Sequence, residues 1–311
     1  MPLVLDTFER KMMIMNMEML KNALYDGTVK KIILDTDTYN EIDDQFALAY
    51  AMLSKDKVDL LSINAAPFLN SRSTSAADGM EKSYQEIFNI MKLVDPNADI
   101  PVYRGSTAFL TDKNTPVESP ACDNIINTVM NSDEPIYIVT LGAITNVASA
   151  IIKCPEIAKR AIVVWLGGHA LHWQDTKEFN LRQDVAAAQI VLDSKIPFVQ
   201  IPCNGVCTHF VTSVPELDYY LGGKNELCDY LVDIVRNYTK KPYGWSKVVW
   251  DVTAVAALVL PESLDIVTIP TPILTPDCRY AFDNARHPYL YVRHSRRDPL
   301  FADLFNKLAN K

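Results

Sequence analysis

From residue 30 onward, short runs of β-branched and other apolar residues alternate with longer segments whose apolar residues recur every three or four positions. The short runs are typical of buried strands and the longer segments of helices. The runs predict strands at 31–34, 59–64, 136–140, 161–165, 198–201, 266–269 and 290–293. The longer segments predict helices at 44–53, 78–91, 124–130, 184–192, 227–235, 252–259 and 298–308, the last with Asp298 as N-cap. This alternation predicts an α/β fold with an open, mostly parallel, twisted sheet covered by helices on both faces, as in Rossmann-like proteins.

The first 29 residues carry a different pattern. A capping box runs from Asp6 to Glu9, and apolar residues recur there at helical spacing: Phe8, Met12, Met15, Met19. We therefore expect an amphipathic helical extension over residues 1–29, whose methionine stripe packs on the core or serves as an oligomer arm. Because no repeat or low-complexity linker interrupts the remainder, residues 30–311 are expected to form a single α/β domain.

Composition narrows the class of protein. The chain has 311 residues, of which 49% are hydrophobic, and this is enough to bury a large core. Its net charge is -8 and it has no basic run, so a nucleic-acid partner is not expected. No apolar stretch reaches the ~18 residues that a membrane span needs, no signal peptide is recognisable, and the six cysteines form no CxxC pair. We expect a cytoplasmic protein with no membrane partner.

An acidic loop follows the first predicted strand. Five carboxylates lie within ten residues: Asp35, Asp37, Glu41, Asp43, Asp44. In parallel sheets ligands bind beyond the carboxyl ends of the strands, so this loop is the first candidate site. So many acids would repel one another in a cleft, and a bound cation would relieve the repulsion. Oxygen ligands favour Ca²⁺ or Mg²⁺ over Zn²⁺. The alternative is that these acids only cap a helix and solvate a turn.

Strand, DTD, DD and helix in succession resemble the inosine-uridine nucleoside hydrolase family, in which D-x-D-P-G-x-D-D follows the first strand. The resemblance implies that Asp37 is general base and Ca²⁺ ligand, that Asp44 is a second ligand and that Asp43 binds a ribose hydroxyl. The Pro-Gly pair is absent and two positions are added. Asn40 and Glu41 therefore form an insertion that we expect to face the substrate.

Three later segments are similar to the same family. In TLGAITN, which begins at residue 140, the resemblance implies that the main-chain carbonyl of Leu141 binds the metal. In the tripeptide EFN, Glu178 and Asn180 would bind the 5'-hydroxyl side of the ribose, and we expect them to point the same way on an extended segment. In the WD pair, Asp251 would be the last metal carboxylate. Trp250 stands where many relatives carry a catalytic His, and an indole at that position favours purines or other flat leaving groups through stacking.

The resemblance to the family is weaker at the positions expected to surround the base and the sugar. Asn70 stands near the place of an asparagine in the family's V-x-G-N segment and is a candidate ribose ligand. His169 follows a Gly-Gly pair and is a candidate for substrate binding and for help to the leaving group. Because these departures spare the expected metal ligands, the chemistry is better defined than the base and the sugar.

The resemblance implies calcium-dependent hydrolysis of the N-glycosidic bond of a riboside. Its catalytic residues would be Asp37, as base, and Trp250, which stacks on the leaving group. Relatives are usually dimers or tetramers, so a homo-oligomer is expected. Two alternatives stay open. DTDT after an apolar strand also fits a haloacid-dehalogenase-type phosphohydrolase that uses Asp35 and Asp37. The same acids would also suit a non-catalytic, calcium-dependent sugar-binding protein.

Overall fold

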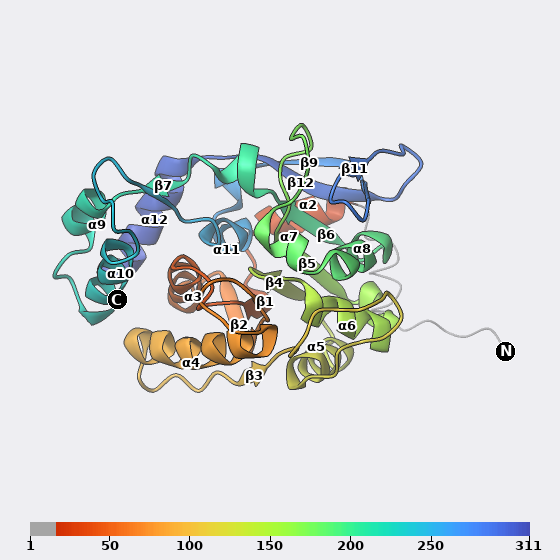
Figure 1. The fold of residues 1–311 in the computed structure, drawn as a ribbon, viewed down its shortest axis with the longest axis horizontal. Coiled ribbons are helices and arrows are strands. Elements are labelled where there is room, and N and C mark those ends of the chain that lie inside the picture. The colour runs from red at the N-terminus through yellow and green to blue at the C-terminus, as the bar shows by residue number, and fades with distance from the viewer. Residues whose placement is uncertain (1–16) are drawn as a thin grey trace.

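The computed structural model describes residues 17–311, and its centre is an eight-stranded sheet in the order β3-β2-β1-β4-β5-β6-β12-β9 (Figure 1). Its strands are β1 Lys30–Thr36, β2 Val58–Ala65, β3 Val102–Arg104, β4 Ile136–Thr140, β5 Ala161–Leu166, β6 Phe198–Ile201, β9 Leu264–Pro270 and β12 Pro288–Ser295. All neighbouring strands are parallel except β9 and β12. The predicted open, mostly parallel sheet is confirmed, and each of the seven predicted strands is present.

Helices cover both faces of the sheet, because alternate side chains of its central strands enter two separate cores. On β1, Ile32 and Leu34 join the core that contains helices α3 and α11, whereas Ile33 joins the core that contains α5, α6 and α8. The helices are α2 Met17–Tyr25, α3 Asp44–Leu53, α4 Ala76–Val94, α5 Pro120–Met130, α6 Thr145–Lys153, α7 Phe179–Gln183, α8 Val185–Asp193, α9 Val214–Tyr220, α10 Glu226–Arg236, α11 Val252–Val259 and α12 Arg297–Ala309. Within residues 17–311 no helix is long and apolar enough to cross a bilayer.

Several helix starts differ from the predicted ones. Helix α4 begins two residues before Asp78, because Ser75 caps it by accepting from the Asp78 N–H at 3.1 Å. Helix α5 likewise begins at Pro120 after a Ser119 cap, not at residue 124. Helix α12 begins at Arg297 with Arg296 at the N-cap, so the prediction that Asp298 caps it was wrong. Asp298 lies in the first turn, where its charge still favours the helix dipole.

The N-terminal pattern is only partly described. The capping box from Asp6 to Glu9 lies outside the described residues, as do most of the methionines of the predicted stripe. In α2 the side chains of Leu20 and Leu24 are buried, whereas Met19 is 49% exposed. The buried face of α2 is therefore its leucine face.

Candidate active site

The acidic loop lies at the centre of the sheet's carboxyl edge. Strand β1, which leads into it, pairs with β2 on one side and with β4 on the other, and Asp35 is in register with Thr140. The Leu141 N–H donates to the Asp35 carbonyl at 2.8 Å, so the chain after β4 leaves the sheet beside the chain after β1. This pairing brings Asp37 next to the segment 141–142.

Three carboxylates gather beyond this edge from two helix starts. Asp43 and Asp44 open α3, Asp251 opens α11, and one oxygen atom from each lies within 4.8 Å of the others. All three side chains are buried. Asp43 and Asp251 occupy N-cap positions but make no side-chain capping hydrogen bond. The alternative that these acids only cap helices therefore does not describe them.

Asp37 lies against this group and is 1% exposed, and neither of its carboxylate oxygens has a hydrogen-bond partner. Burial raises its pKa well above the usual range, and the nearby charges of Asp44 and Asp43 raise it further. Burial likewise raises the pKa of Asp44 to about 7, although Thr36 Oγ1 donates to its Oδ1 at 2.5 Å. Buried, mutually repelling carboxylates with free oxygen atoms are costly without a cation. Their hard oxygens suit Ca²⁺ or Mg²⁺, so these residues fit a divalent cation.

Gly142 makes this approach of Asp37 possible. A Cβ atom at residue 142 would lie 2.8 Å from Asp37 Cγ and 3.1 Å from its Oδ1. The main chain after β4 therefore packs directly on the carboxylate that bears free oxygens. Leu141, just before it, lines the pocket, and its carbonyl accepts from Asn180 Nδ2 at 2.6 Å. A carbonyl oxygen has two lone pairs, so this bond leaves one free for a metal.

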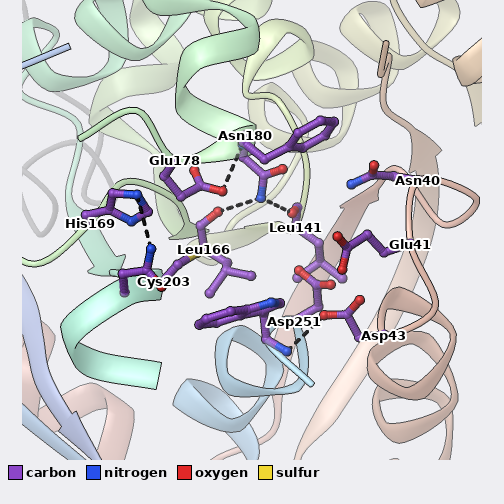
Figure 2. A pocket seen from close by; sticks show the side chains of 13 residues that line it. Asn40, Glu41, Asp43, Leu141, Leu166, His169, Glu178, Asn180, Cys203 and Asp251 are labelled. Atoms are coloured by element: carbon purple, nitrogen blue, oxygen red, sulfur yellow. Dashed lines mark hydrogen bonds between the residues drawn. The ribbon is translucent and has the colours of Figure 1, made fainter. Parts of the chain in front are cut away.

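The insertion Asn40-Glu41 lines the pocket on the side away from His169 (Figure 2). Arg72 fixes this insertion by donating to the Glu41 carbonyl at 2.7 Å. Asn70 donates to Asn40 Oδ1 at 2.6 Å and does not line the pocket. The structure thus places Asn70, a candidate ribose ligand, behind the insertion.

The EFN segment is not extended as expected. Glu178 is the N-cap of α7, and its carboxylate accepts the N–H groups of Gly168, Asn180 and Leu181 at 2.9–3.0 Å. Asn180 lies in the first turn of α7, because a carboxylate that accepts these amides starts a helix there. Both side chains nevertheless line the pocket. Burial raises the pKa of Glu178 despite the three amides.

The pocket has a volume of about 160 Å³ and is lined by most of the predicted residues, although Asp37 and Asp44 are not part of its lining. His169 lines it, with its Nε2 3.3 Å from Asn204 Nδ2 and its Nδ1 buried without a partner. Burial lowers the pKa of His169. Four lining residues were not predicted: Leu166, Phe179, Cys203, Asn204. Asn204 follows β6 closely, so the rule of polar residues after strands could have found it, whereas the apolar Leu166 carries no such signal.

Asn146, from the TLGAITN segment, joins β1, β2 and the chain just after β3. Its Nδ2 donates to Asp35 Oδ2 at 2.9 Å and to the Ala65 carbonyl at 3.3 Å, and its Oδ1 accepts from the Ser106 N–H at 2.8 Å. Asn146→Ala leaves several buried polar groups unpaired and should lower the free energy of unfolding by about 3 kcal/mol in urea denaturation. Asn127→Ala, on the exposed side of α5, should change it by less than about 0.5 kcal/mol. A loss below about 1 kcal/mol for Asn146→Ala would contradict this assignment.

Buried carboxylates and a polar pocket lie together at the carboxyl edge of an open α/β sheet. This arrangement is typical of a hydrolase with a metal centre. The chain matches the inosine-uridine preferring nucleoside hydrolase family over residues 32–287 and belongs to that family. It is therefore a hydrolase that acts on the N-glycosidic bond of ribonucleosides, in a family that depends on a metal. The phosphohydrolase and non-catalytic alternatives are set aside by this membership.

Two curated relatives and a solved structure are similar to this chain. Over 256 residues the chain is 26% identical to the non-specific ribonucleoside hydrolase RihC of Salmonella enteritidis, which covers 74% of this chain and 79% of the relative. It is 32% identical over 205 residues to an uncharacterised protein of Schizosaccharomyces pombe, covering 56% of this chain and 61% of the relative. The solved purine-preferring ribonucleoside hydrolase of Gardnerella vaginalis superposes with a TM-score of 0.75 at 21% identity, over 90% of this chain and 98% of the other. That likeness confirms the fold.

Proposed function

We propose that this enzyme is a calcium-dependent hydrolase of purine ribosides. The observation that carries the proposal is the pair of buried, unpartnered oxygens of Asp37 beside the carboxylates of Asp44 and Asp251. These three side chains and the Leu141 carbonyl would hold the ion. When bound, Ca²⁺ would polarise the attacking water and hold the sugar hydroxyls.

The chain's own residues then have separate tasks. Asp37 takes a proton from the attacking water as the water oxygen bonds to the anomeric carbon. The electron pair of the broken C–N bond leaves with the base, which takes up a proton from solvent. Asp43 accepts a ribose hydroxyl, and the insertion Asn40-Glu41 closes this side of the pocket. Glu178 and Asn180 lie across the pocket, on the 5' side of the sugar. Holding water and sugar in one orientation removes much of the entropic cost of the reaction.

Trp250 and His169 would contact the base as it leaves. Trp250 lines the pocket directly before Asp251, so its indole can stack on a flat base next to the sugar site. His169 offers a buried ring nitrogen without a partner in the same pocket. The preference for purines follows from stacking, which increases with the area of the base.

The proposal is tested by measuring reducing-sugar release from inosine, guanosine, adenosine, uridine and cytidine, with added Ca²⁺ or with a chelator. We expect release from the purine ribosides that stops in chelator and returns with Ca²⁺. Release that persists in chelator would overturn the calcium dependence. Faster release from uridine and cytidine than from the purines would overturn the purine preference.

Replacing the indole tests its role in specificity. Trp250→Ala should lower kcat/KM for inosine about tenfold to a hundredfold, because one stacked base contributes ~1–3 kcal/mol. The loss for uridine, which has a smaller ring, should be less. Trp245→Phe is a matched control, because Trp245 stacks on Tyr238 outside the pocket lining. Equal losses for both ribosides would show that Trp250 does not set the preference.

A further inference from the structure

Lys247 is a buried cation beside the acidic cluster, which consists of Asp37, Asp43, Asp44 and Asp251. It has no role in the proposed reaction. Its side chain is only 7% exposed. Its Nζ pairs with the carboxylate of Glu41 and lies 3.2 Å from Asp43 Oδ1. Burial would lower the pKa of Lys247, but the charges of Asp43 and Glu41 outweigh it and raise the pKa above its usual value.

The main chain fixes this lysine in place. Lys247 lies in the two-residue strand β8 Lys247–Val248, which pairs antiparallel with β7 Val211–Thr212 and puts Thr212 opposite Lys247. Three residues later the Trp250 N–H donates to Asp43 Oδ2 at 2.9 Å. One short segment therefore holds both oxygens of Asp43, one through a cation and the other through a backbone amide.

Asp37 and Asp43 differ in this respect, although both lie in the cluster. By the separation of oxygen atoms, Asp43 groups with Asp44 and Asp251 as a possible metal ligand. Its Oδ1 accepts no hydrogen bond but lies in an ion pair with Lys247 Nζ, and its Oδ2 accepts from the Trp250 N–H, whereas neither oxygen of Asp37 has a hydrogen-bond partner. If Asp43 turned to ligate an ion through Oδ1, it would lose its ion pair with Lys247, and only the partly exposed carboxylate of Glu41 would remain to offset the burial of the ammonium group.

We infer that Lys247 is a positioning residue that keeps Asp43 out of the metal's ligand set and reserves it for a sugar hydroxyl. The inference rests on the proposed function, because it assumes that the cluster binds a divalent cation. It also gives the insertion a task, since Glu41 supplies the second carboxylate that a buried lysine beside Asp43 needs. Arg72 and Asn70 hold that insertion in position.

The inference predicts that loss of the lysine strengthens metal binding and weakens sugar binding. In Lys247→Met, Asp43 can turn towards the cluster, so Ca²⁺ should bind about tenfold more tightly by titration calorimetry, because affinity follows the number of charged ligands. The KM for inosine should rise about tenfold, because Asp43 leaves the sugar. Lys247→Arg should restore much of both values.

A double-mutant cycle separates this mechanism from a general effect of charge. Removing any nearby positive charge attracts cations, and that effect would persist when Asp43 is neutral. If Lys247 acts through Asp43, the gain in Ca²⁺ affinity from Lys247→Met should disappear in the Asp43→Asn background. Lys241→Met is the charge control, since it removes an exposed cation six residues earlier in the chain that forms no ion pair with Asp43 or Glu41.

The outcomes are distinguishable. A wild-type protein that binds no Ca²⁺ refutes the proposed function itself. A wild type that binds Ca²⁺, with no gain in Lys247→Met or with an equal gain in the Asp43→Asn background, refutes only the role of Lys247. Lys247→Gln, which keeps a donor towards Glu41, replaces the Met variant if thermal unfolding shows that the latter does not fold.

Discussion

Asp37→Asn should reduce kcat/KM for inosine by at least about 10³-fold while the protein remains folded. General-base catalysis contributes about 10²- to 10⁴-fold, and the substitution also removes a proposed metal ligand. In chelator the free energy of unfolding should stay the same or rise, because a neutral amide removes the repulsion from Asp44 and Asp43. Steady-state kinetics and urea denaturation measure the two effects separately. A gain in stability with loss of turnover is typical of a group retained for function.

Asp35→Asn is the matched control for this experiment. Asp35 is two residues earlier on the same chain, and burial raises its pKa to about 7. Its Oδ2 accepts from Asn146 Nδ2, whereas both oxygens of Asp37 lack a hydrogen-bond partner. An amide oxygen can still accept that bond, so turnover should stay within about tenfold of wild type. If Asp35→Asn lost as much activity as Asp37→Asn, loop packing and not chemistry would explain both losses.

The central sheet could be predicted from the sequence because its strands are buried on both faces and appear as continuous apolar runs. Strand β3 was missed because it has three residues and is partly exposed, so it carries no run. Strands β7 and β8 have two residues each, too few for any period. Helix starts were placed late at α4 and α5 because serine caps lie outside the apolar periodicity that located these helices.

Some residues of the site could likewise be predicted from the sequence, and others could not. Asp43, Asp44 and Asp251 could be found because they stand next to recognisable strands or helices, and the structure brings them together across about 200 residues of sequence. Lys247 could not be found from the sequence. It approaches Asp43 and Glu41 only because β7 pairs with β8 and because the insertion brings Glu41 to it. Glu178 lines the pocket, but the helix that it starts depends on its contact with Gly168 ten residues earlier.

Gly142→Ala should lower kcat about a hundredfold without a comparable loss of stability. The new methyl group would lie 2.8 Å from Asp37 Cγ, closer than atoms can approach, so either the carboxylate or the strand end must move. The strand end is held by the bond from Leu141 to Asp35, so we expect Asp37 to move. A displacement of about 1 Å at a reacting group can cost about 10²-fold in rate. Single-turnover kinetics with inosine would measure the loss at the chemical step.

The informative control is Gly223→Ala, which should have the opposite effects. Gly223 has a φ of +70° with no atom within 4 Å of an added Cβ, so alanine there strains the backbone without touching a neighbour. It should cost about 1 kcal/mol of stability and leave kcat unchanged. Gly142 does not have a positive φ, so its alanine variant adds no such strain and acts through contact with Asp37. If Gly142→Ala kept wild-type kcat, Asp37 would tolerate displacement, and its exact position could not be what makes it the base.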